Sequence, residues 1–186
     1  FKIGKTTAIA AVYGPRELHP KFLQNPQTGI LRVDYNMLPF SGTGERVRPG
    51  GNRRSKEISL VTQKALLPVL DLGEYPNSVV DVFIELPQTE AGSRCAGICA
   101  ASMALADAGL LMKDLVCAVS VGKVGDKLVV DLDSSEENFE EGSTDLPVAI
   151  LPNLNMISLI QMDGPISAEE LKKALEMAKS ACKKIY

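Results

Sequence analysis

The chain has few of the residues on which metal and redox sites are usually built. Its 186 residues include no tryptophan, a single histidine and four cysteines. No two cysteines form a CxxC pair, so a zinc site is not expected. The cysteines, Cys95, Cys99, Cys117 and Cys182, are interpreted as buried free thiols of a protein in a reducing compartment rather than as ligands or redox groups. We assign no catalytic part to His19.

The chain also lacks long apolar runs and a strong net charge. No run of eighteen apolar residues is present, and the first residues are not a charged head followed by an apolar stretch. Neither a membrane span nor a secretory signal is indicated, so we expect a cytoplasmic protein without a membrane partner. The formal net charge is −3, and an anionic partner must therefore be held by a local basic patch.

What the chain does have is the composition of a globular protein, with 45% hydrophobic and 23% charged residues. Alternating and β-branched segments predict strands, the first of which ends at a turn at Gly14-Pro15. One helix is predicted from an N-cap at Ser55 to Pro68, and a second begins after residue 92. A third is predicted at the C-terminus, where Ser167 and Glu170 form a capping box. The remaining strands are predicted over 29–37, 78–86, 114–122, 127–133, 146–152 and 156–164.

This order of elements predicts an α+β fold, in which helices pack on a sheet of mostly antiparallel strands. Two hairpins precede the last helix, and the first of them turns at Gly125-Asp126. Nothing in the composition divides the chain, so we expect one domain over residues 1–186.

The most basic stretch is a glycine-rich and arginine-rich loop over residues 41–55. Its cations, together with the lysine just beyond it, are Arg46, Arg48, Arg53, Arg54 and Lys56.

A second candidate site lies at the start of the helix within LPQTEAGSRCAGICAASMALADAG, residues 86–109. The first turn of a helix offers unpaired backbone N–H groups and the positive end of the helix dipole. Gly92 allows close approach, Ser93 adds a hydroxyl donor and Arg94 adds a planar fork, a combination that favours a phosphate. From spacing alone, a plain helix entrance with a surface arginine is equally compatible. The small residues that follow predict close packing against a neighbouring element.

Several motifs resemble the ribonuclease PH family. They are, in chain order, AAVYGPRELHPK, YNMLPFS, RPGGNRRSKEIS, DVFIEL, EAGSRCAGICAASMALADAG, DLPVAILP and LIQMDG. The YNMLPFS and QMDG versions favour the branch that forms the phosphorolytic ring subunit of the archaeal exosome. The resemblance implies the ribonuclease PH-like fold, also described as ribosomal protein S5 domain 2-like. We expect the family's N-terminal segment and the end of its C-terminal helix to lie outside this sequence.

The resemblance implies a reaction in which inorganic phosphate, as co-substrate, attacks the terminal phosphodiester at the 3′ end of RNA and releases nucleoside diphosphates. Gly92, Ser93 and Arg94 match the family's phosphate-binding turn. Arg53 and Arg54 match a pair of arginines that grip the RNA backbone near its 3′ end, and Arg94 also faces the RNA.

Two carboxylates complete the implied site. Active members carry two aspartates here. Glu137 stands in the place of the first, and Asp145 matches the second after an apparent insertion of about two residues. Both are implied to be catalytic and to hold Mg²⁺ or Mn²⁺, because magnesium prefers oxygen ligands. Three neighbours, Glu136, Glu140 and Glu141, could replace them if the loop shifts, but solvated loop charge is the simpler interpretation of all three.

The implied partners are the 3′ end of single-stranded RNA, a second ribonuclease PH-like subunit in a hexameric ring, and RNA-binding cap proteins. Two alternatives stay open. One is an RNA-binding ring subunit that has lost catalysis because of Glu137 and the altered acidic loop. The other is a homohexameric ribonuclease PH that trims tRNA 3′ ends.

Overall fold

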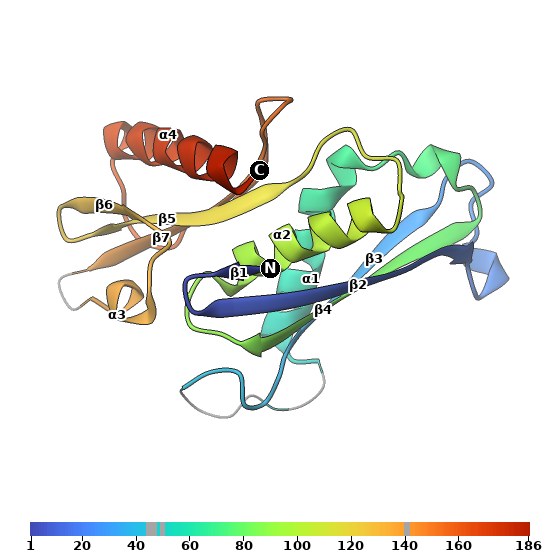
Figure 1. The fold of residues 1–186 in the computed structure, drawn as a ribbon, viewed down its shortest axis with the longest axis horizontal. Helices are drawn as coiled ribbons and strands as arrows, with labels where there is room; N and C mark the ends of the chain where they lie inside the picture. The colour runs from blue at the N-terminus through green and yellow to red at the C-terminus, as the bar shows by residue number, and fades with distance from the viewer. Residues whose placement is uncertain (44–47, 49–50, 140–141) are drawn as a thin grey trace.

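The first half of the chain forms a four-stranded sheet with two helices on one face. The structure is a computed structural model that describes residues 1–43, 48, 51–139 and 142–186. The strand order is β1-β2-β4-β3. Helices α1 and α2 pack side by side on this sheet, α1 against β3 and α2 against β2 and β4 (Figure 1). The bounds are β1 Lys2–Ile3, β2 Thr6–Glu17, β3 Ile30–Met37, α1 Arg53–Leu66, β4 Ser78–Gln88 and α2 Ser93–Asp107.

The second half forms another four-stranded sheet, of order β6-β5-β7-β8, in which all neighbours are antiparallel. A short helix, α3, lies between β6 and β7, and the C-terminal helix α4 packs on β5 and β7. The bounds are β5 Cys117–Val124, β6 Lys127–Val130, α3 Ser134–Glu137, β7 Ser143–Leu151, β8 Met156–Ile160 and α4 Ala168–Ile185. The turn at Gly125-Asp126 and the capping box of Ser167 and Glu170 are confirmed.

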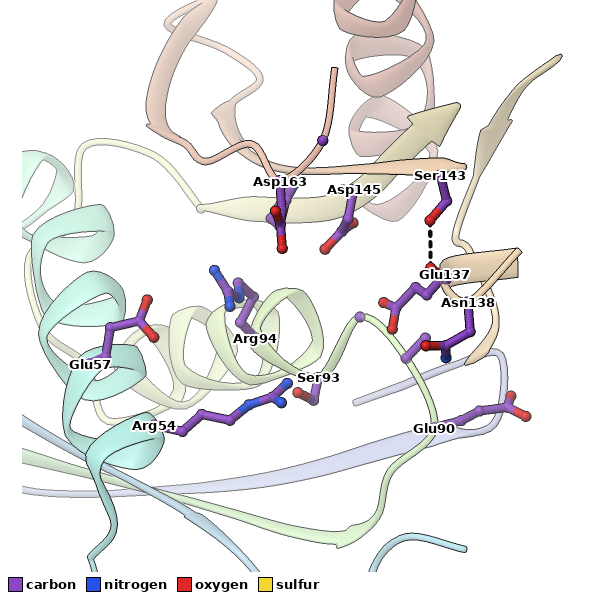
Figure 2. A pocket seen from close by; sticks show the side chains of 14 residues that line it. Arg54, Glu57, Glu90, Ser93, Arg94, Glu137, Asn138, Ser143, Asp145 and Asp163 are labelled. Atoms are coloured by element: carbon purple, nitrogen blue, oxygen red, sulfur yellow. Dashed lines mark hydrogen bonds between the residues drawn. The ribbon is translucent and has the colours of Figure 1, made fainter. Parts of the chain in front are cut away.

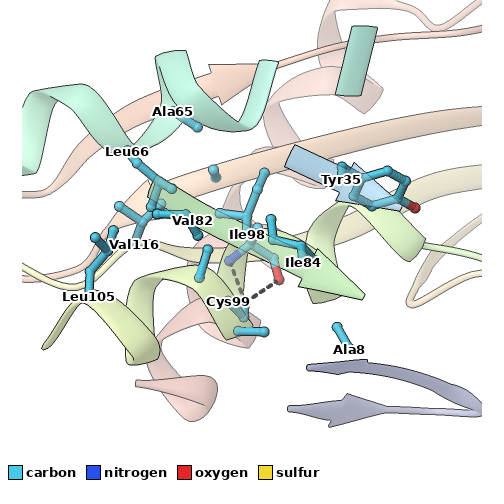
Figure 3. Close-up of a cluster of buried hydrophobic side chains, with 14 of the residues drawn as sticks. Ala8, Tyr35, Ala65, Leu66, Val82, Ile84, Ile98, Cys99, Leu105 and Val116 are labelled. Carbon is cyan, nitrogen blue, oxygen red and sulfur yellow. Dashed lines mark hydrogen bonds between the residues drawn. The ribbon is translucent and has the colours of Figure 1, made fainter. Parts of the chain in front are cut away.

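Helix α2 lies between the two sheets, and this position explains its small side chains. Ten of its residues are buried, including Gly97, Ala100 and Ala101. A Cβ atom on Gly97 would lie 3.3 Å from Ile84 and 3.4 Å from the ring of Tyr35. Cys99 exchanges hydrogen bonds with the backbone of Ala118 in the second sheet. The predicted close packing is confirmed, and one buried cluster joins residues of both sheets (Figure 3).

The four cysteines are buried free thiols, as the sequence predicts. Cys95 and Cys99 belong to the cluster around α2, whereas Cys117 and Cys182 lie in a second cluster beneath α4. Burial raises the pKa of Cys99 and of Cys182 to about 12, which keeps both protonated and unreactive.

Several predicted element boundaries are wrong. The strands predicted over 114–122, 127–133 and 156–164 span 117–124, 127–130 and 156–160 in the structure. Strand β2 does not end at Gly14-Pro15 but continues to Glu17, with a shift in its pairing to β4 between Tyr13 and Arg16. Proline has no N–H to donate to a sheet, and such an irregularity accommodates it. The N-cap of α1 is Asn52 instead of Ser55. The Asn52 side chain accepts from the Ser55 amide at 2.7 Å, and the Ser55 hydroxyl accepts from the Asn52 amide at 2.9 Å.

The predicted α+β class with mostly antiparallel strands is correct, but the prediction of one sheet is wrong. The strands are mostly antiparallel, but they form two sheets, and β3 runs parallel to β4. A parallel pair needs a crossover connection, and α1 supplies it. The single domain over residues 1–186 stays a prediction, which the cluster shared by the two sheets favours. Within the described part of the chain, no helix is both long enough and apolar enough to cross a membrane.

Candidate phosphate and RNA site

A polar cavity of about 500 Å³ opens where the first turn of α1, the first turn of α2, the end of α3 and strand β7 meet. Figure 2 shows arginines and carboxylates from these separate elements pointing into the same space. The side chains and backbone that line the cavity belong to Arg54, Glu57, Glu90, Ala91, Gly92, Ser93, Arg94, Glu137, Asn138, Ser143, Asp145, Pro147, Asp163 and Gly164.

The turn before α2 forms one wall of this cavity. Gly92 is the N-cap, with φ 61° and ψ 20°, a left-handed conformation that glycine adopts without strain. No side chain caps the helix there among the described residues. The backbone amides of Ser93 and Arg94 therefore stay available at the cavity wall, where the helix dipole favours an anion, whereas the Cys95 amide donates to the Gly92 carbonyl at 3.0 Å.

Two arginines reach the cavity from different helices. Arg94 belongs to the first turn of α2 and is half-buried, and Arg54 belongs to the first turn of α1. Among the described residues, neither guanidinium lies within ion-pair distance of a carboxylate, so both charges stay available to a ligand. The guanidinium Nη1 of Arg94 donates a hydrogen bond to Oε1 of Gln161.

The start of α1 decides which basic residue enters the cavity. Because Asn52 caps the helix, Arg53 and Arg54 are its first two residues and point in different directions. Arg54 lines the cavity, whereas Arg53 is exposed and does not. The structure therefore brings Arg54 together with the Gly92 turn and leaves Arg53 outside. Arg46 lies outside the described residues.

Two predicted carboxylates, Glu137 and Asp145, face each other across the cavity (Figure 2). Glu137 is the last residue of α3, and the hydroxyl of Ser143 donates to its backbone carbonyl. Asp145 on β7 accepts a hydrogen bond from the buried hydroxyl of Ser120 on β5. Burial, and next the charge of Asp145, raise the pKa of Glu137, although the Gly92 amide and the two arginines oppose this rise.

The neighbouring glutamates do not replace this pair. The Glu136 carboxylate accepts from the backbone amide of Asp133 at 2.9 Å and so closes the capping box of α3. It does not line the cavity. Glu140 and Glu141 lie outside the described residues.

The structure adds residues that the sequence interpretation did not select. Asp163, after β8, lines the cavity beside Asp145, and the two backbones exchange hydrogen bonds of 2.8 and 2.9 Å. Glu57, one turn after Arg53 on α1, also lines the cavity. Asp163 belongs to the QMDG motif, which is one of the motifs that resemble the family, and this motif could have identified it as a site residue. Nothing in the local sequence around Glu57 separates it from an exposed helical glutamate.

Models of known protein families match both halves of the chain. Residues 1–110 match domain 1 of the 3′ exoribonuclease family, RNase PH, and residues 114–181 match domain 2. The division between the two matches falls between α2 and β5.

Similar proteins include exosome components from archaea. The exosome complex component Rrp41 of Thermococcus gammatolerans is 54% identical over 183 residues, covering 98% of this chain and 72% of the relative. Rrp41 of Methanopyrus kandleri is 48% identical over 186 residues, covering 100% and 77%. The crystal structure of rice Rrp46 shares the fold, with a TM-score of 0.83 and 22% identity over 98% of this chain and 81% of that one. As the sequence predicts, the chain belongs to the ribonuclease PH family of 3′ exoribonucleases.

Proposed function

We propose that this protein is the phosphorolytic subunit of an exosome ring, which shortens RNA from its 3′ end and releases nucleoside diphosphates. The observation that carries the proposal is the open start of α2, where the Gly92 turn and Arg94 share one cavity with Arg54 and two carboxylates. In this proposal Gly92, Ser93 and Arg94 bind inorganic phosphate. The RNA end lies against Arg54, with Arg53 contacting the RNA backbone outside the cavity.

In the proposed reaction, Arg54 and Arg94 reduce the repulsion between phosphate and RNA. An oxygen of the bound phosphate bonds to the phosphorus of the last nucleotide, the bond from that phosphorus to the preceding 3′ oxygen breaks, and this oxygen takes up a proton. Two polyanions must approach each other, so charge neutralisation is the main task. Arg54 and Arg94 have no carboxylate partner in the described structure and are suited to it.

The carboxylates fit a divalent cation. No group of three or more candidate metal-binding side chains occurs among the described residues. Magnesium, however, keeps several waters and needs only one or two carboxylates beside a substrate phosphate. Asp145 and Glu137 would hold Mg²⁺ or Mn²⁺, and Ser120 would orient Asp145. When bound, the cation would neutralise charge that develops on the phosphate oxygens.

A phosphate titration tests the proposal directly. With single-stranded RNA and magnesium, the assembled protein is expected to release nucleoside diphosphates at a rate that rises with phosphate concentration. Arg94→Ala should raise the KM for phosphate, by about 10-fold or more, because a charge-assisted hydrogen bond is lost. Nucleoside monophosphates as the only product, or a phosphate dependence that Arg94→Ala leaves unchanged, would reject it.

Glu137 keeps one alternative open, that of a ring subunit that binds RNA without degrading it. The extra methylene of glutamate displaces the carboxylate by about 1 Å, which can cost about 10²-fold in rate. If this alternative holds, the wild-type protein is inactive and Glu137→Asp gains activity. An active wild type excludes it. The other alternative is a homohexameric enzyme that trims tRNA. The mass of the assembly formed after expression of this chain alone distinguishes it from a heteromeric complex.

The proposal includes the assembly and its location. Exosome components work with other subunits, and the relatives carry that name. We expect a second ribonuclease PH-like subunit in a hexameric ring, RNA-binding cap proteins above it, and a cytoplasmic location, which the buried free thiols favour.

A further inference from the structure

We propose that Gln161 is a positioning residue for Arg94, which fixes the guanidinium at the cavity without neutralising its charge. This inference rests on the proposed role of Arg94 in binding phosphate. Gln161 follows β8, is half-buried and does not line the cavity. Any effect on phosphate would therefore pass through its neighbour.

Three elements meet at this side chain. Its Oε1 accepts a hydrogen bond from Nη1 of Arg94 on α2, and its Nε2 donates to Oε1 of Glu57 on α1 at 3.4 Å. The two partners are 67 and 104 residues away along the chain. Figure 2 shows Glu57 and Arg94 on facing sides of this corner of the cavity.

Hydrogen-bonding chemistry explains why the amide oxygen of Gln161 contacts Arg94 and its amide nitrogen contacts Glu57. An arginine can only donate hydrogen bonds and an ionised carboxylate can only accept them. A glutamine amide does both, so it has one orientation in which it satisfies Arg94 and Glu57 together. Each partner thus fixes the amide, and the amide in turn fixes Arg94.

The neutrality of the amide is the important property. If Glu57 contacted Arg94 directly, the ion pair would offset the charge that phosphate needs. With Gln161 between them, Arg94 has an acceptor that holds its rotamer, and it has no ion pair within the described residues. A preorganised cation loses less side-chain entropy when the anion binds.

Two substitutions separate position from charge in the full-length protein assembled with its ring partner. Gln161→Met has a similar length but no acceptor, and it is expected to raise the KM for phosphate about 10-fold, with kcat at saturating phosphate within about two-fold of wild type. Gln161→Glu keeps the acceptor and adds a negative charge, and its KM for phosphate is expected to rise at least as far. An unchanged KM in Gln161→Met overturns the positioning role, and an unchanged KM in Gln161→Glu overturns the argument from charge.

Gln63→Met is the matched control for loss of a glutamine amide. Gln63 is also half-buried, and it donates to the Leu31 carbonyl at 2.7 Å on the far part of α1. This variant is expected to lower the melting temperature while leaving the KM for phosphate unchanged. If it raises that KM as much as Gln161→Met does, the effect is structural and the proposal fails. If Gln161→Met does not assemble, Gln161→Asn, which is too short to reach both partners, replaces it.

The double variant distinguishes this inference from the proposed function. In an Arg94→Ala background, Gln161→Met is expected to cause no further rise in the KM for phosphate, because its partner is gone. Equal effects in both backgrounds would overturn the inference. If Arg94→Ala alone leaves the KM unchanged, the proposed function fails. If Arg94→Ala raises it and Gln161→Met does not, only the positioning role fails. Calorimetric titration with inorganic phosphate provides a readout independent of activity.

Discussion

At the scale of single residues, Glu137 is the position on which the proposed catalysis depends most directly. Its carboxylate lies in the cavity with Asp145, and burial together with that neighbour disfavours its ionised form. A bound cation would relieve the repulsion between the two carboxylates. We predict that Glu137→Gln lowers kcat by about 10²-fold or more and raises the magnesium concentration needed for half-maximal rate. Rates measured across a magnesium series check this, and an unchanged magnesium dependence contradicts it.

A second residue, Asp81 on β4, is held by two arginines outside the cavity. It is 5% exposed and binds Arg32 through two hydrogen bonds of 2.6 and 2.9 Å, and Arg16 through one of 2.6 Å. The hydrogen bonds from Arg32 are the main reason that its pKa lies below the usual 3.8. A lowered pKa means that the ionised carboxylate stabilises the fold above pH 3.8, and that this contribution is lost as the pH falls through the folded-state value.

We therefore predict that Asp81→Asn lowers the free energy of unfolding by about 1–3 kcal/mol at pH 7. The difference from wild type should shrink below pH 3.8. Urea denaturation at pH 7 and pH 3 measures both values. A constant difference at the two pH values would show that the ion pairs do not account for it.

At the scale of elements, the small side chains of α2 let this helix pack between the two sheets, and this packing places its first turn at the cavity. The helix must fit between two sheets and still present its first turn to the cavity. Gly97 is closely packed, because a Cβ there would already be 3.3 Å from Ile84 and 3.4 Å from Tyr35.

We predict that Gly97→Leu destabilises the protein by about 1–3 kcal/mol or more, since overpacking forces neighbours off their rotamers. Ala106→Leu is the matched control, because residue 106 is exposed on the same helix and should change stability little. Thermal denaturation compares the two variants. Equal melting temperatures would show that the two sheets can separate to admit a larger helix.

At the scale of the whole molecule, the exposed apolar side chains indicate contact with other subunits. One group lies on the face of the first sheet away from the helices, where Tyr13 and Phe83 pack edge to face with centroids 5.6 Å apart. Another group lies on β8 and just beyond its end, and it includes Met156, Ile160 and Met162. Large apolar residues gathered in this way are typical of protein interfaces.

We predict that the isolated chain is poorly soluble or self-associated, and that coexpression with a second ribonuclease PH-like subunit yields a soluble complex of both. Light scattering on the chain alone and on the complex measures the mass of each. A stable, soluble monomer would contradict the prediction.

The sequence alone determined the features that depend on neighbours within a few residues. Alternation predicts β3 and the capping box predicts the start of α4, and the structure has both. The Gly92 turn predicts an anion site at a helix start, which stays a prediction. The family resemblance extended this to Glu137 and Asp145. Each of these interpretations uses interactions that lie next to one another in the chain, so they can be recognised before the fold is known.

Only the tertiary structure decided which of these residues meet. It brought Arg54 into the cavity and left Arg53 outside, because a cap at Asn52 sets the rotation of α1. It separated the strands into two sheets and placed Glu57 and Gln161 around Arg94. The physical reason is that the contacts across 67 and 104 residues depend on how α2 and α1 pack against the two sheets, and no local pattern encodes that packing.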